Sequence, residues 1–268
     1  MSQKPNKYKP IYTVRKSSNK TKQIQVAIQK LSQQNVYDIC LQYGFSLQMP
    51  QANALTEYLF LLQKWNQSMN LVGKSSWQDI LKELVLDSLH LAKYLNEHLI
   101  FGSEFLPYGM NEKYHTFQFT ENTKPNLETW DLGAGAGLPG IPLRILWNQG
   151  NYSLVEAREK RTLFLNMINI KLGLENTFIC RERAENFMQN KMANLIISRA
   201  FMPYEKMLPF IAPYLYSQKE NGSVIFLTLE KIDAKKYNTE QYQWETTNIY
   251  EYKIQGIKRF FCEIQKIS

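Results

Sequence analysis

The segment WDLGAGAGLPGIPL, residues 130–143, joins a hydrophobic run to a turn with glycine at every second position, Gly133, Gly135 and Gly137. Glycine tolerates positive φ angles and lets a ligand approach the backbone closely. Pro142 suits the first turn of a helix, where its missing N–H group is harmless. The segment therefore predicts a strand, a tight turn and a helix whose first amide groups attract a carboxylate or another anion.

The spacing of the glycines favours one kind of cofactor. The dinucleotide-binding pattern is G-x-G-x-x-G, and Leu138 occupies its third glycine position here. The pattern D-x-G-x-G-x-G, which begins at Asp131, is instead typical of class I S-adenosylmethionine methyltransferases. Glu156 ends the next hydrophobic run, 19 residues after Gly137, where a carboxylate can accept hydrogen bonds from both ribose hydroxyls of a nucleoside. A carboxylate at this position also suits NAD. The glycine spacing, and not Glu156, therefore favours S-adenosylmethionine over NAD.

Hydrophobic runs alternate with helical patterns after residue 127, which predicts a parallel sheet with helices on both faces. The last two runs have no helix between them and predict a hairpin, which gives the sheet one antiparallel strand. Earlier apolar residues recur at helical spacing over 23–44, 51–69 and 77–95. The expected strands are 127–132, 152–156, 176–180, 194–198, 223–229, 247–253 and 259–265.

The predicted fold is α/β, a class I S-adenosylmethionine-dependent methyltransferase (Rossmann-like) seven-stranded sheet with an N-terminal helical subdomain. Its expected segments are a basic disordered arm over 1–22, helices over 23–98, a loop or insertion over 99–126 and a methyltransferase domain over 127–268.

The net charge of +8 is concentrated at the N-terminus. Residues 1–37 hold eight basic residues and no acid, so the rest of the 268-residue chain carries 24 of each and is neutral. Basic arms commonly contact nucleic acid or an anionic surface. The alternative is a solvated tail that keeps the protein soluble.

Composition excludes several classes of protein. With 44% hydrophobic residues, the chain can bury a core. No stretch reaches the roughly 18 apolar residues of a membrane span, and residues 1–22 lack the apolar region of a secretory signal. Cys40, Cys180 and Cys262 form no C-x-x-C pair, and the three histidines have no metal-ligand spacing. We expect a cytoplasmic protein without a metal or a membrane contact; a monomer is favoured, although the sequence leaves the oligomeric state open.

The methyl acceptor follows by elimination. Amino-group methyltransferases place an Asp/Asn-Pro-Pro-aromatic tetrapeptide after the fourth strand, where this chain has Ser-Arg-Ala-Phe at 198–201. Pyrimidine C5 methylation needs a thiolate nucleophile, and none of the three cysteines follows a proline. Guanine N7 already has a lone pair, so its methylation needs neither that tetrapeptide nor a thiolate. Catalysis can then depend on positioning and electrostatics.

Several separated motifs resemble those of the RsmG (GidB) family, the bacterial guanine-N7 methyltransferases of 16S ribosomal RNA. The turn over 131–142 is similar to that family's glycine turn. The resemblance spans roughly residues 50–265 and follows the family's order. The other motifs are Asn70-Leu71, Leu86-Asp87-Ser88-Leu89, Glu156 with Lys160-Arg161, Arg183-Ala184-Glu185, Ser198-Arg199-Ala200-Phe201 and Lys258-Arg259.

The resemblance implies S-adenosyl-L-methionine as cofactor and 16S rRNA or the small ribosomal subunit as partner, with methylation expected in the 530 loop. Ala184 and Glu185 would hold the adenine of the donor, and Arg199 would lie beside the donor and the target base. Lys160, Arg183 and Arg259 would engage the RNA or the guanine, which makes these three and Arg199 the candidate catalytic residues. The candidate cofactor-binding residues are Asp131, Gly133, Gly135, Gly137, Leu138, Glu156, Ala184, Glu185 and Arg199.

The chain departs from the family pattern at two places. Glu83 and Leu84 stand where the family often has Arg-His, and Thr228-Leu229 stands where it has Lys-Gly. These departures affect local contacts. The alternative functions are a non-catalytic RNA-binding or ribosome-assembly module, or a methyltransferase acting on another RNA or on a protein; a dehydrogenase ranks below both.

Overall fold

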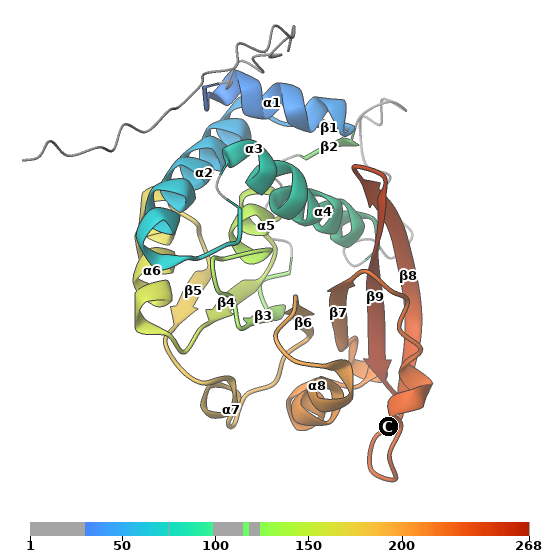
Figure 1. Cartoon of the computed structure of the whole chain (residues 1–268). Helices are drawn as coiled ribbons and strands as arrows, with labels where there is room; N and C mark the ends of the chain where they lie inside the picture. Colours follow the sequence, from blue (N-terminus) through green and yellow to red (C-terminus); the bar gives the residue numbers. More distant parts are fainter. Residues whose placement is uncertain (1–29, 75, 99–114, 118–123, 268) are drawn as a thin grey trace, which may run out of the picture. The chain divides into compact units, whose positions relative to one another are not determined.

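The computed structural model describes residues 30–74, 76–98, 115–117 and 124–267 (Figure 1). Residues Leu31–Ser268 form one compact unit. The basic arm predicted over 1–22 lies outside the described residues, as do the start of the helix predicted over 23–44 and most of the loop predicted over 99–126.

Seven strands form one sheet in the order β5-β4-β3-β6-β7-β9-β8. The first five of these run parallel, and β9 pairs antiparallel with both β7 and β8. The predicted seven-stranded sheet with one antiparallel strand is therefore confirmed. The strands are β3 (Glu128–Leu132), β4 (Asn151–Val155), β5 (Thr177–Cys180), β6 (Leu195–Ser198), β7 (Ser223–Thr228), β8 (Trp244–Ile254) and β9 (Ile257–Lys266).

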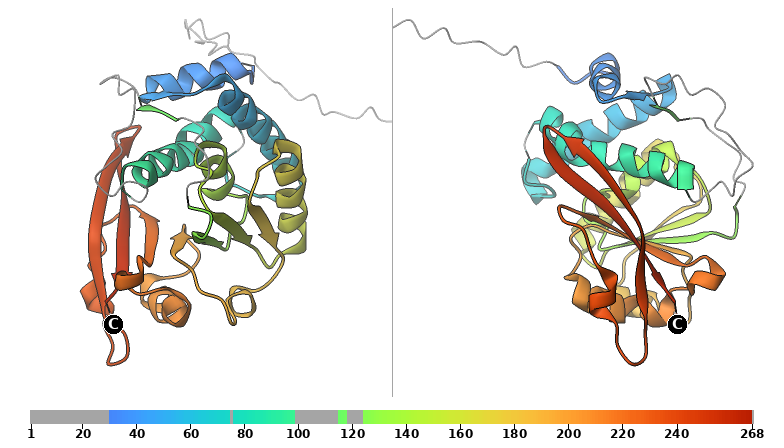
Figure 2. Two further views of the ribbon diagram at one scale, coloured as in Figure 1. Left: turned by 180° about the vertical axis from the view of Figure 1, so that it is seen from behind. Right: turned by 90° about the vertical axis from the view of Figure 1, so that its right-hand side faces the viewer.

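Helices cover both faces of the sheet, as predicted (Figures 1 and 2). One apolar cluster joins α2, α4, α5 and α6 to one face through side chains such as Leu59, Leu91 and Leu154. A second cluster, which includes Phe187 and Leu208, joins α7 and α8 to the other face. The helices that cover the sheet are α2 (Met49–Met69), α4 (Leu86–His98), α5 (Gly140–Leu146), α6 (Glu159–Leu172), α7 (Ala184–Phe187) and α8 (Tyr204–Ile211).

The first helices differ in detail from the apolar pattern. Helix α1 (Gln33–Gln42) ends just before Gly44, whose φ of 87° stops the helix. The helix predicted over 77–95 is instead α3 (Trp77–Ile80), a π-helical turn η1 (Leu81–Val85) and α4. A π turn has hydrogen bonds between residues five apart, and such turns are frequent at functional sites. Apolar spacing does not reveal such a turn, and neither does it predict the short pair β1 (Phe45–Ser46) and β2 (His115–Thr116).

Candidate active site

The glycine turn leaves β3 at the carboxyl edge of the sheet. Gly133, Gly135 and Gly137 all have positive φ angles, of 74°, 58° and 79°. The amide of Gly133 donates a hydrogen bond to the carbonyl of Val155 at 2.9 Å, which fixes the turn to the end of β4. A Cβ atom at Gly133 would lie 2.4 Å from the ring of Phe201. The predicted strand, turn and helix are confirmed, and Gly133 has no room for a side chain.

Glu156 follows β4 and is oriented by the turn. One carboxylate oxygen accepts a hydrogen bond from the Gly135 amide at 3.0 Å, and the other accepts one from the Arg158 amide at 2.9 Å. Arg161 Nη1 lies 3.7 Å from the first oxygen. A carboxylate oxygen has two lone pairs, so Glu156 is held in place and still has capacity to accept hydrogen bonds from two ribose hydroxyls.

Asp131 lies beneath the turn and is 2% exposed. Its carboxyl accepts hydrogen bonds from the backbone of Gly140, at the start of α5, and from the Tyr152 hydroxyl at 3.5 Å. Burial raises the pKa of Asp131 to about 7, against the opposing effects of these hydrogen bonds. Because its contacts are with the protein, Asp131 joins the glycine turn to the helix that follows it.

The segment after β6 turns sharply at Ala200. Its φ of 52° is uncommon for a residue with a side chain and costs about 1–2 kcal/mol. The turn brings Phe201 against Gly133, while Arg199 extends to the π turn and α4. Backbone strain of this kind is concentrated at functional sites.

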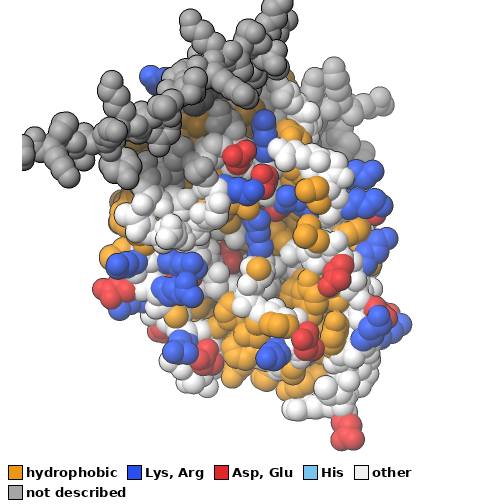
Figure 3. All heavy atoms as spheres, viewed as in Figure 1, with side chains coloured by type: hydrophobic (Ala, Val, Ile, Leu, Met, Phe, Trp, Pro, Cys, Tyr) orange, Lys and Arg blue, Asp and Glu red, His pale blue; other side chains and the backbone are white. Residues whose placement is uncertain are grey.

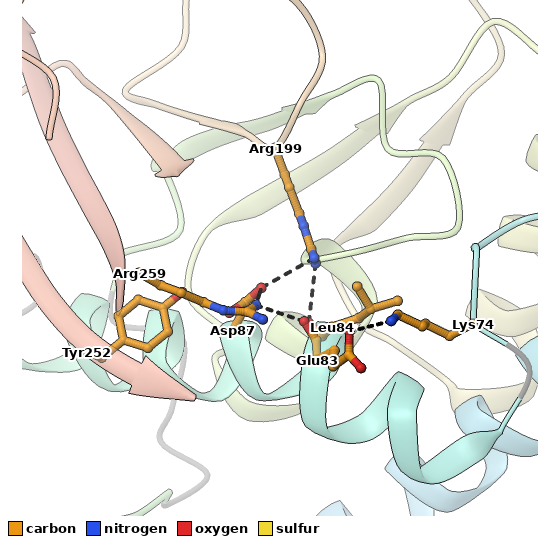
Figure 4. A network of polar contacts seen from close by, with 7 residues as sticks. All are labelled: Lys74, Glu83, Leu84, Asp87, Arg199, Tyr252 and Arg259. Carbon is orange, nitrogen blue, oxygen red and sulfur yellow. Dashed lines mark hydrogen bonds and ion pairs between the residues drawn. The ribbon is translucent and has the colours of Figure 1, made fainter. Parts of the chain in front are cut away.

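Arg199 and Arg259 meet at a single buried carboxylate, that of Asp87 (Figure 4). Arg199 Nη2 lies 3.3 Å from Asp87 Oδ2, and Arg259 Nη1 donates to both carboxylate oxygens at 2.7 Å. The Tyr252 hydroxyl donates to Asp87 Oδ1 at 2.9 Å. The Asp87 side chain is 5% exposed, against 22% for Arg199 and 13% for Arg259. Asp87 therefore holds the two predicted arginines, Arg199 and Arg259, together. We call these three residues the arginine unit.

The π turn supplies two further acceptors to this unit. Arg199 Nη1 donates to the carbonyl of Leu84 at 3.3 Å, and Arg259 Nη1 donates to the carbonyl of Glu83 at 2.8 Å. Residues 83 and 84 are one of the two places at which the sequence departs from the RsmG pattern, and both contacts use the backbone. The Glu83 side chain forms an ion pair with Lys74 at 2.7 Å. The arginines are thus held in a way that does not depend on the side chains at 83 and 84.

The other candidate residues are separate from the arginine pair. Lys160 is exposed in the first turn of α6. Arg183 precedes α7 with its side chain 75% exposed, and lies 3.7 Å from Glu185. Ala184 is buried between them, and Leu138 is partly buried against the core. Lys160 and Arg183 therefore follow β4 and β5, while Arg199 follows β6 and Arg259 lies on β9.

Sequence reasoning missed the role of Asp87 and Tyr252. Asp87 was present in the motif Leu86-Asp87-Ser88-Leu89, but its partners lie more than 100 positions later in the chain. The only available signal was a carboxylate within the apolar face of a helix. On the face in Figure 3, Lys and Arg side chains with carboxylates among them gather at the centre, and others lie over α6 and along β8.

Other kinds of site are not found in the part of the chain that the structure describes. In that part, no group of three or more His, Cys, Asp or Glu side chains could hold a metal ion. Its helices also include none with the length and apolar character that crossing a membrane requires.

A sheet of this strand order, with a glycine turn after β3 and an acid after β4, defines a class I S-adenosylmethionine-dependent methyltransferase. Comparison with known proteins identifies the family. The family model for rRNA small subunit methyltransferase G matches residues 51–101 and 104–262, and the chain belongs to that family.

Relatives agree over most of the chain. The ribosomal RNA small subunit methyltransferase G of Nitratidesulfovibrio vulgaris (strain DP4) is 38% identical over 239 residues, which are 89% of this chain and 96% of that protein. The protein of the same name from Lawsonia intracellularis is 40% identical and covers 85% and 93%. The fold is also similar to a crystal structure of MtNAS in complex with MTA and tNA, at a TM-score of 0.50 and 11% identity, over 82% of this chain and 75% of that one.

Proposed function

We propose that the protein transfers a methyl group from S-adenosylmethionine to N7 of a guanine in 16S ribosomal RNA, in the 530 loop. The observation on which the proposal rests is the arrangement at the carboxyl edge of the sheet, where the glycine turn and Glu156 lie on one side and the pair Arg199 and Arg259 on the other. Membership in the rRNA small subunit methyltransferase G family supports the same reaction.

The residues around the glycine turn fit the methyl donor. Gly133, Gly135 and Leu138 would lie along it, because glycines at positive φ let a ligand approach the backbone closely. Glu156 would accept hydrogen bonds from the ribose hydroxyls, and Ala184 with Glu185 would hold the adenine. When bound, S-adenosylmethionine supplies an electrophilic methyl group on a sulfonium. The chain's task is to orient that group and to exclude competing nucleophiles.

The acceptor needs no general base, because guanine N7 attacks with its own lone pair. Arg199 and Arg259 would position the base, since arginine hydrogen-bonds well to guanine and phosphate. Lys160 and Arg183 are exposed and would contact the RNA backbone. We propose that the protein acts in the cytoplasm, on a ribosomal substrate, and that a monomer binds the small ribosomal subunit.

The proposal is tested by mapping N7-methylguanine in 16S rRNA from cells with and without the gene. We expect one modified guanine to disappear on deletion and to return when the wild-type gene is supplied. A modification that persists after deletion contradicts the proposal. A loss confined to another RNA would favour the alternative of a different RNA substrate, and no change in any RNA would favour a non-catalytic module.

The basic segment at the start of the chain gives a separate prediction. Deleting residues 1–22 removes seven of the eight basic residues that precede residue 38. Phosphate contacts release counterions, so the deletion should weaken RNA binding and flatten its dependence on salt without changing the methylated nucleotide. Titrations of both proteins across a salt series measure this effect. Equal affinities and equal salt slopes would show that the segment only aids solubility.

A further inference from the structure

Asp87 is a buried carboxylate whose hydrogen-bonded partners, far along the chain, lie opposite each other on the neighbouring strands β8 and β9. It accepts hydrogen bonds from Arg259 and Tyr252 and forms an ion pair with Arg199 (Figure 4). The ring of His90, one turn later in α4, stacks on that of Tyr252 with centroids 4.3 Å apart. Burial, with help from nearby Lys93 and Arg259, lowers the pKa of His90 to about 3, so this ring is neutral. The cluster therefore has two positive charges and one negative charge.

Each of the two terminal nitrogens of Arg199 has one partner in the protein. Nη1 donates to the Leu84 carbonyl and Nη2 pairs with Asp87, each at 3.3 Å. In Figure 4 the end of the Arg199 guanidinium points toward these two acceptors. A guanidinium forms its strongest bidentate contacts through two neighbouring N–H groups. The two terminal nitrogens of the Arg199 guanidinium, which we call its fork, therefore point toward α4 and the π turn.

This orientation matters for a reaction at guanine N7. The commonest specific contact between arginine and guanine is bidentate, with one N–H group donating to O6 and another to N7. Such a contact would place a hydrogen bond on the lone pair that must attack the methyl carbon. An arginine beside an N7 acceptor is useful only if its fork cannot engage O6 and N7 together.

We propose that Asp87 is a positioning residue that, with the Leu84 carbonyl, holds the fork of Arg199 away from N7 of the target guanine. This inference rests on the proposed function, because it concerns the same guanine. Arg259 secures the carboxylate through two hydrogen bonds of 2.7 Å and is itself held by the Glu83 carbonyl. The π turn is part of this arrangement, because its Glu83 and Leu84 carbonyls each accept a hydrogen bond from one of the two arginines.

The test is Asp87→Asn, which keeps the size of the side chain and removes its charge. With small ribosomal subunits as substrate, we expect kcat to fall about 100-fold, a loss typical of a misplaced reacting group, while KM for the subunit falls, because the freed guanidinium gains a contact with guanine N7. Asp87→Glu restores the charge and should recover part of kcat. A kcat within threefold of wild type in Asp87→Asn would overturn the inference.

A binding experiment separates this role from a structural one. RNA fragments that span the mapped nucleotide are made with guanosine or 7-deazaguanosine there, the latter lacking the N7 acceptor. Wild-type protein should bind both fragments equally. In Asp87→Asn the released fork can engage N7, so the guanosine fragment should bind about tenfold more tightly than the other. Equal binding by the variant would overturn the inference.

Glu263→Gln is the matched control. Glu263 is a buried carboxylate that accepts a hydrogen bond from Tyr94, which also belongs to α4, and it has no contact with the two arginines in the described residues. We expect its kcat to remain near that of wild type; a loss equal to that of Asp87→Asn would contradict a specific role for Asp87. If wild-type protein produces no N7-methylguanine, the proposed function fails instead, so the two failures are distinguishable.

Discussion

Arg199→Ala should remain folded and lose methyl transfer by about 100-fold or more, the effect of removing a preorganised charge from an active site. Arg199 follows β6 at the carboxyl edge of the sheet, and its side chain is 22% exposed. Stability should change little, because Asp87 keeps its hydrogen bonds from Arg259 and Tyr252 when Arg199 is removed. No unpaired buried charge is left behind.

The measurement compares initial rates on small ribosomal subunits with labelled S-adenosylmethionine, alongside thermal unfolding. Arg181→Ala is the control. Arg181 lies just after β5 with its side chain 58% exposed, and its partner Glu159 is equally exposed. That variant loses a positive charge near the same edge and should keep its rate. Near-normal activity of Arg199→Ala would exclude Arg199 from the reaction, and unfolding of that variant would show that its role is structural.

The sheet and its glycine turn could be predicted from the sequence because their determinants are local. Strand β3 and the turn after it follow from the run at 130–143, in which the glycines alternate and Pro142 marks the helix. The closing hairpin follows from two hydrophobic runs with no helix between them, although β8 begins at Trp244, earlier than the predicted residue 247.

The arginine unit could not be predicted, because its determinants are far apart in the chain. Arg259 and Asp87 are separated by 172 positions, and one hydrogen-bond acceptor of each arginine is a backbone carbonyl. Every residue has a backbone carbonyl, so the residue type does not show which carbonyl accepts a hydrogen bond from an arginine. The π turn that carries these carbonyls has the sequence LKELV, with no glycine or proline to mark it. The resemblance to the family's motifs pointed to Arg199 and to Arg259 as separate site residues. It did not predict that both contact Asp87.

The departure at 83–84 has a physical explanation in the same contacts. A change of side chain at Glu83 or Leu84 leaves the backbone acceptors for both arginines in place. The acidic side chain of Glu83 adds an ion pair with Lys74, in the loop that follows α2. Both groups of that pair are partly exposed, so its effect on stability is small. The sequence difference is therefore compatible with an unchanged arrangement of the arginine unit.

Gly135→Val should abolish binding of S-adenosylmethionine, with a loss of affinity of at least about 100-fold. A Cβ atom built at Gly135 has only Arg161 Nη1, at 3.4 Å, and the carbonyl oxygen of Gly133, at 3.7 Å, within 4 Å among the described residues. The valine side chain would therefore fit within the protein and occupy the space beside the turn where we place the donor. Calorimetric titration of the donor measures the effect, and chemical denaturation measures stability.

The φ angle of Gly135 complicates this experiment, because 58° strains any residue with a side chain by about 1–2 kcal/mol. Gly173→Val is the matched control. Gly173 has a φ of 59°, and a Cβ atom added there would have no atom within 4 Å. It follows the last residue of α6, whereas the first turn of that helix is the end at the carboxyl edge of the sheet. Both variants should lose similar stability, and only Gly135→Val should lose the donor. Unchanged donor affinity in Gly135→Val would exclude the glycine turn as the binding site, and equal losses in both variants would attribute the effect to backbone strain.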